Sequence, residues 1–210
     1  MPSFLTLYLG AFLRPRRTLD ALVADPRRVR LAACAVALSC ACYQLVYLFL
    51  ARSGGRPTVF TPWLAIPAED YYRFNQWVIV PSLVLAWVAA AGFAQLAARA
   101  LGGTGEFEGT LAALGFGLSV STWWTGLHDV VTTFLGWLRV IDQRAYEDAL
   151  STPTPFRTAL WVLMTGYLVW FLLTFSMGVG AAHRLRVAPA AVAGTTGVVV
   201  YQLVFVIFNR

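Results

Sequence analysis

The sequence predicts an all-α, polytopic membrane protein: a five-span transmembrane helix bundle with N-terminal interfacial helices. Of its 210 residues, 59% are hydrophobic and only 12% are charged, whereas soluble domains average about 25% charged residues. The apolar residues form long uninterrupted runs. A helix needs about 20 such residues to cross a hydrocarbon core about 30 Å thick. The length of the chain suits one compact membrane domain.

A glycine-rich segment, Gly102–Thr110, is the centre of this prediction. The run 77–98 before it has one glutamine and no charge, and the run 110–127 after it has no charge. Glycine adopts the left-handed conformations that end a helix without steric cost. Because the connection is so short, it predicts that the two flanking helices are antiparallel neighbours.

Residues 1–30 are expected to form a cytoplasmic, amphipathic segment at the membrane interface. Ser3 can cap a first helix, and Pro15 interrupts this helix or begins a second one because it lacks an amide donor. The apolar faces would contact acyl chains, and the basic residues would contact anionic headgroups. These headgroup ligands are Arg14, Arg16 and Arg17. The alternative is that both helices pack against the bundle as a plug.

The transmembrane domain is predicted over residues 31–208. Its spans are placed at about residues 31–51, 74–101, 110–128, 159–182 and 188–208. Pro81 lies near the start of the second span, where a kink is tolerable. Residues 130–138 are apolar but too short to cross, so they either extend the third helix or lie along the surface.

Small residues at four-residue spacing predict tight packing between the spans, because close backbone contact replaces the hydrophobic effect in lipid. The predicted stripes are Ala33, Ala37 and Ala41; Ala86, Ala90, Ala94 and Ala98; Gly109, Ala113, Gly117 and Ser121; and Ala190, Gly194 and Val198.

Polar residues inside the apolar runs have two interpretations. They can bond between helices, for about 1 kcal/mol each, or they can line a solute path. The candidate cavity or interhelical residues are Gln44, Gln95, Thr122, Thr125, His128 and Gln202. No carboxylate is predicted at mid-depth, which argues against an ion-coupled transporter.

Two pairs of neighbouring residues could suggest chemistry. His128-Asp129 lies about 27 Å along the third span, so the pair is expected near the far interface or in a shallow cavity; an intramembrane catalytic or proton-relay role is the alternative. Glu147 and Asp148 are interpreted as a solvated helix face rather than a metal site.

Other sequence features argue against an enzyme. The three cysteines lie in one apolar run, where they suit packing better than a disulfide or a zinc site. The glycines at 102–105 follow a helix and lack the lysine of a nucleotide-binding loop. We therefore expect no catalytic residue, no cofactor and no metal. The net charge of +6 is explained by positive flanks of spans rather than by nucleic-acid binding.

Arginine placement predicts the orientation. If five spans alternate, nine arginines fall on the side of the N-terminus and seven on the other side. Six of the nine precede the first span, which usually dominates. This predicts a cytoplasmic N-terminus and an external C-terminus.

Several short motifs give the chain a resemblance to a known family. Phe12-Leu13-Arg14-Pro15 is followed by Asp25-Pro26-Arg27, and the turn Gly102–Phe107 leads into Ala112-Ala113-Leu114-Gly115-Phe116. With five predicted spans, this pattern resembles the bacterial form of the YIP family, the Ypt/Rab-interacting membrane proteins. The resemblance implies a five-span bundle with a cytoplasmic N-terminus and no catalytic residues. The vesicle-traffic role of eukaryotic relatives is not carried over.

Three functions follow as hypotheses. The first is a non-enzymatic protein of the bacterial inner membrane that binds membrane lipids, a membrane-protein partner or a second copy of itself. The second is a transporter or channel for a small solute or lipid. The third is an intramembrane enzyme that uses His128 and Asp129.

Overall fold

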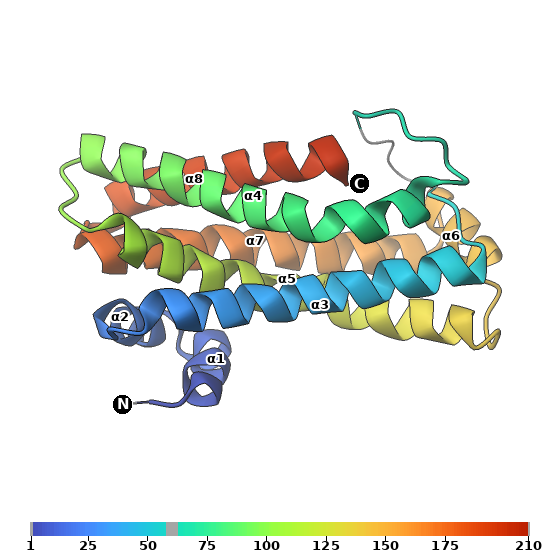
Figure 1. The fold of residues 1–210 in the computed structure, drawn as a ribbon, viewed down its shortest axis with the longest axis horizontal. Coiled ribbons are helices and arrows are strands. Elements are labelled where there is room, and N and C mark those ends of the chain that lie inside the picture. The colour runs from blue at the N-terminus through green and yellow to red at the C-terminus, as the bar shows by residue number, and fades with distance from the viewer. Residues whose placement is uncertain (1, 58–62, 210) are drawn as a thin grey trace.

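The computed structural model describes residues 2–57 and 63–209, and within these ranges all regular structure is helical. The helices are α1 (Phe4–Leu13), α2 (Pro15–Ala24), α3 (Arg28–Ser53), α4 (Tyr71–Ala100), α5 (Phe107–Trp137), α6 (Gln143–Ser151), α7 (Pro155–His183) and α8 (Val187–Phe208). Five long helices, α3, α4, α5, α7 and α8, run lengthwise along the bundle, and the two ends of the chain lie toward opposite ends of it (Figure 1). The predicted all-helical membrane bundle is confirmed.

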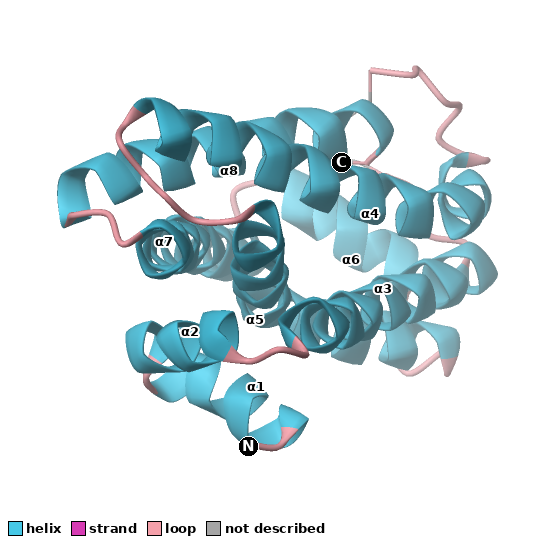
Figure 2. Ribbon diagram, turned by 60° about the vertical axis from the view of Figure 1, so that its left-hand side comes forward, coloured by secondary structure: helices cyan, strands magenta, loops and turns pink. Residues whose placement is uncertain are grey.

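Four of the long helices, α3, α4, α7 and α8, are long and apolar enough to cross a membrane. The fifth, α5, has 31 residues, but recurring glycine, serine and threonine make it less apolar. Figure 2 shows why this is tolerated: α5 lies between α7 and α3, with α4 and α8 on one side and the N-terminal helices on the other. The first half of α5 is therefore enclosed by other helices, whereas Trp124, Leu127 and Val131 of its second half are exposed. That α5 crosses the bilayer, which would make five crossings, remains a prediction.

The core is built on α5. Along residues 109–122 every side chain except that of Leu111 is buried. A Cβ built on Gly117 would lie 3.1 Å from Phe175 of α7, and one on Gly178 would lie 3.0 Å from Ala113 of α5. The predicted small residues of this helix therefore let α5 and α7 approach closely.

The other confirmed stripe packs α4 against α8. Ala86, Ala90, Ala94 and Ala98 are fully buried. A Cβ on Gly197 of α8 would lie 3.2 Å from the Cβ of Ala94. The stripe that begins at Ala190 is also buried, as predicted.

The predicted stripe on α3 is wrong. Ala33, Ala37 and Ala41 are exposed, and α3 instead buries the face that carries Ala35 and Ser39. Ser119 of α5 donates a hydrogen bond to the Ala35 carbonyl at 2.7 Å, and Ser39 donates to Ser119 at 3.0 Å. These polar contacts fix the rotation of α3, whereas alanine, present on both faces, does not.

The glycine turn forms as predicted. Gly102 has a φ of 87° and ends α4. The amide of Gly103 donates to the Ala98 carbonyl at 2.8 Å, and that of Gly102 donates to the Arg99 carbonyl at 3.1 Å. This pair of bonds is the Schellman arrangement, which satisfies the last carbonyls of a helix. It returns the chain directly into α5.

Residues 130–138 extend the third long helix, since α5 continues to Trp137. The polar segment that follows contains a helix that the sequence did not delimit, α6. Its N-cap is Asp142, whose carboxylate accepts the amides of Arg144 and Ala145 at 2.9 and 3.1 Å. Capping of this kind stabilises a helix by about 1 kcal/mol.

Candidate functional site

The N-terminal helices form a hairpin beside the bundle. Ser3 accepts the amide of Thr6 at 3.2 Å and caps α1, while Pro15 occupies the first turn of α2. Both local predictions are confirmed. At Gly10 the two helices come so close that a Cβ would lie 2.7 Å from the Thr18 hydroxyl oxygen.

A buried polar network attaches α1 to the central helix. The Tyr8 hydroxyl lies 2.8 Å from the Ser119 hydroxyl and accepts the indole N–H of Trp123 at 2.7 Å. Because Ser119 donates to the Ala35 carbonyl, Tyr8 is the donor to Ser119. Every member of the network therefore has a partner, as buried polar groups require.

The contact between α1 and α5 lies well inside the length of α5. Ser119 and Trp123 follow Phe107, the first residue of α5, by 12 and 16 positions, which correspond to about 18 and 24 Å along a helix. The contacts of α1 therefore agree with the alternative prediction, in which the N-terminal helices pack against the bundle. The placement of α1 relative to the membrane interface remains a prediction.

Helix α2 covers the end of the bundle near the glycine turn. Leu19 and Leu22 are buried, and Val23 lies 3.5 Å from a Cβ built on Gly109. At the start of α3, Arg28 forms ion pairs with Glu106 and Glu108 at 2.6 and 3.0 Å. The N-terminal segment is therefore tied to the turn between α4 and α5.

The connection after α2 is also held by charge. Arg27 contacts the carboxylate of Asp25 at 3.0 Å and donates to the Pro2 carbonyl at 3.2 Å. Hydrogen bonds from Arg27 lower the pKa of the Asp25 carboxyl group. The hydrogen bond to Pro2 joins the start of the chain to the end of α2, and the ion pair with Asp25 holds Arg27 in place.

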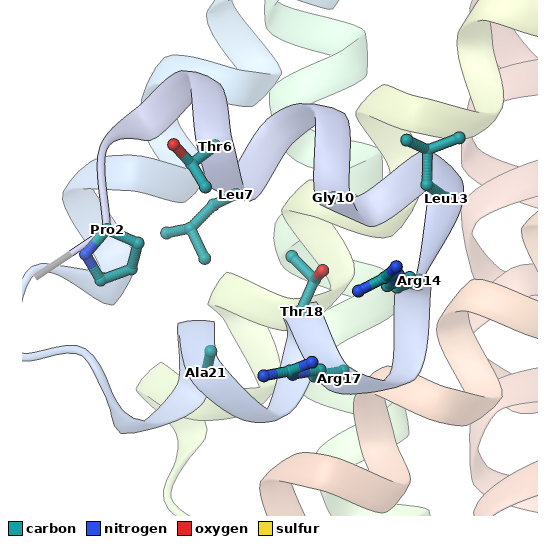
Figure 3. Close-up of a pocket in the computed structure, with 9 residues that line it drawn as sticks. All are labelled: Pro2, Thr6, Leu7, Gly10, Leu13, Arg14, Arg17, Thr18 and Ala21. Atoms are coloured by element: carbon teal, nitrogen blue, oxygen red, sulfur yellow. The ribbon is translucent and has the colours of Figure 1, made fainter.

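A groove of about 490 Å³ lies between α1 and α2 (Figure 3). Its walls are formed by Pro2, Thr6, Leu7, Gly10, Leu13, Arg14, Arg17, Thr18 and Ala21. Arg14 is the linking residue between the helices, so it stands where the hairpin turns, and Leu7 extends from α1 into the gap. Of the three arginines predicted to bind headgroups, Arg16 is not part of the groove wall.

The predicted interhelical residues do not form one group: the glutamines lie on different helices, whereas Thr122, Thr125 and His128 follow one another on α5. Gln44 donates to the Gln76 carbonyl of α4 at 2.9 Å, and Gln202 donates to the Tyr167 hydroxyl of α7 at 3.2 Å. Thr122 donates to a carbonyl of its own helix, that of Leu118, at 3.0 Å. Thr125, on the same helix, is buried.

Gln95 belongs to a cluster that sequence reasoning missed. His183, the last residue of α7, places its Nε2 2.8 Å from the Thr110 hydroxyl and 2.9 Å from the Gln95 side-chain oxygen. Its Nδ1 accepts the amide of Gly105 at 3.1 Å, and Gln95 donates to the Gly105 carbonyl at 3.0 Å. The cluster clamps the glycine turn to the end of α7.

His128 and Asp129 form a hydrogen-bonded pair near the far end of the bundle. Nδ1 of His128 lies 2.9 Å from the Asp129 carboxylate, and Nε2 lies 2.7 Å from the Tyr146 hydroxyl of α6. Both side chains are partly exposed. Among the described residues no group of three His, Cys, Asp or Glu side chains could hold a metal ion.

The prediction for Glu147 is wrong. Asp148 is exposed as expected, but Glu147 is buried, accepts the Tyr72 hydroxyl at 2.7 Å and also accepts the amide of Arg56. Arg56 belongs to the connection between α3 and α4, and Tyr72 lies in the first turn of α4, so the carboxylate ties α6 to the start of α4 and to the connection before it. Local helical spacing could not show contacts from so far along the chain.

A helical bundle with four long apolar helices able to cross a membrane, a fifth long helix at its centre and a docked N-terminal hairpin defines a multi-pass integral membrane protein. Within that class, the family model of the Yip1 domain matches residues 9–208. The chain belongs to the Yip1 family, which confirms the resemblance to the YIP family inferred from its motifs. No protein of curated function and no solved structure matches the chain with statistical significance.

Proposed function

We propose that this Yip1-family protein is non-enzymatic and acts by binding other constituents of the membrane, either lipids or membrane proteins. The observation that carries the proposal is the N-terminal hairpin. One of its helices is fixed to the core through Tyr8, while its groove and its exposed arginines face outward. A rigid scaffold that presents an apolar groove and free cationic groups is suited to binding an amphiphile.

The transporter alternative receives no comparable support. The glutamines expected to line a path, Gln44, Gln95 and Gln202, each bond to a different part of the bundle. We further propose that the protein lies in the bacterial inner membrane. Because arginines are most numerous before the first span, the proposed orientation has the N-terminus in the cytoplasm and, with five crossings, the C-terminus outside.

Native mass spectrometry of the full chain, released from mild detergent, tests the proposal. We expect the protein to retain lipid adducts or a co-purified membrane protein through delipidating washes. The same spectrum reports the number of subunits. Recovery of the bare chain only, together with solute flux into proteoliposomes that contain it, would contradict the proposal and favour transport.

A further inference from the structure

We infer that the groove between α1 and α2 binds an anionic phospholipid, with the headgroup phosphate at Arg14 and Arg17 and the first part of an acyl chain along the apolar wall. This inference rests on the proposed function and makes it specific. It names one site, one class of ligand and the two cationic residues that recognise it.

The shape of the groove suits part of a lipid. Its volume, about 490 Å³, lies within the range of small-molecule sites, which is about 300–1,000 Å³. Pro2, Leu7 and Leu13 give it apolar walls. Gly10 of α1 and Thr18 of α2 approach closely and both line the groove. The groove is therefore formed by the two helices of the hairpin alone.

The charge of the groove suits an anion. The side chains of Arg14 and Arg17 are exposed and form no ion pair or hydrogen bond with the described residues. In contrast, the nearby Arg27 and Arg28 are paired with carboxylates. The uncompensated positive charge of the groove is therefore available to a ligand, and guanidinium groups bind phosphate through paired, charge-assisted hydrogen bonds.

The surface around the groove favours a lipid over a free anion. On α1, Leu5, Leu9 and Leu13 are 64%, 56% and 81% exposed. These side chains continue the apolar wall outward, and Leu13 belongs to both surfaces. A water-soluble phosphate gains nothing from such a surface, whereas acyl chains cover it and hold the headgroup beside the arginines.

The test compares two variants that lose the same charge. Arg14→Gln/Arg17→Gln removes both groove arginines, and Arg16→Gln/Arg30→Gln removes two exposed arginines that do not line the groove. Detergent-solubilised full chain is titrated with phosphatidylglycerol or phosphatidylcholine, and adducts are counted by native mass spectrometry. We expect phosphatidylglycerol to bind preferentially, and the groove variant to bind it at least about tenfold more weakly than the control variant does.

Two further measurements test whether the ligand occupies the groove and whether it is a lipid or a free phosphate. Ala21→Trp fills the groove without changing its charge and should also weaken phosphatidylglycerol binding, while unchanged thermal unfolding confirms that each variant is folded. Inorganic phosphate at millimolar concentration should not displace the lipid; full displacement would show a phosphate site and overturn the lipid assignment. Equal binding by both charge variants overturns the groove but leaves the proposed function intact. Failure of the wild type to retain any lipid or protein overturns both.

Discussion

Gly105→Ala should cost about 3 kcal/mol of stability, the upper part of the range for overpacking a close-packed site. A Cβ at this position would lie 2.7 Å from the backbone carbon of Ala182 and would overlap the carbonyl oxygen of that residue. Backbone at the end of a packed helix cannot move aside as a flexible side chain can. The substitution should also disturb the bonds that Gly105 makes to His183 and Gln95.

The measurement is thermal unfolding in detergent, with Gly92→Ala as the matched control. A Cβ on Gly92, inside α4, would meet nothing within 4 Å. Alanine is favoured over glycine in a helix by about 1 kcal/mol, so the control should be unchanged or slightly more stable. Equal stability of the two variants would show that the glycine turn is not closely packed against the end of α7.

Tyr8→Ala should release α1 from the bundle. The substitution removes a ring that stacks on Phe4 at 5.4 Å and lies 6.1 Å from Phe116, and it leaves the Trp123 N–H without its acceptor. Loss of a buried aromatic side chain typically costs 3–5 kcal/mol, and the lost hydrogen bond of the partly buried Trp123 adds about 1 kcal/mol. A short helix cannot remain docked after losses of this size.

Limited proteolysis of the N-terminal segment checks this expectation. Tyr8→Ala should be cleaved within α1 at least about tenfold faster than the wild type, while the bundle remains resistant. Leu9→Ala is the control, since Leu9 lies on the same helix but is 56% exposed. Tyr8→Phe should be intermediate, because it keeps the ring contacts and loses only the hydroxyl. Equal cleavage of Tyr8→Ala and Leu9→Ala would mean that Tyr8 does not hold α1.

The architecture was accessible from the sequence because its signals are local. The apolar runs predict the long helices, and a glycine-rich segment between two such runs predicts a tight turn. Ala86, Ala90, Ala94 and Ala98 occupy one face of a helix, so their spacing alone predicted a buried face. Ser3 and Pro15 predicted the starts of two helices because capping and proline effects are also local.

What the sequence could not supply depends on partners far along the chain. Tyr8 and Ser119 are 111 positions apart, and His183 lies 78 positions from Gly105. Glu147 resembled a solvated residue because its partners lie far along the chain: Tyr72 at the start of α4 and Arg56 in the connection before it. Ala33 lies on α3, where both faces carry alanine, so composition could not choose the buried one.

One further signal in the sequence could have predicted the central position of α5. Its glycine, serine and threonine residues lower its hydropathy, and apart from Thr132 they are buried, where they do not face lipid. The same feature explains why α5 is the one long helix that length and composition do not mark as a span. Whether it crosses the bilayer therefore decides the topology of the protein.

The most direct test of this topology is a pair of reporters fused after Arg210 in the full chain. If α5 crosses together with α3, α4, α7 and α8, and the N-terminus is cytoplasmic, the C-terminus lies outside. Alkaline phosphatase at that position should then be active, and a green fluorescent protein there should remain dark. A fluorescent C-terminal fusion with an inactive phosphatase, from a chain whose N-terminus is cytoplasmic, would show an even number of crossings and contradict the five-span bundle.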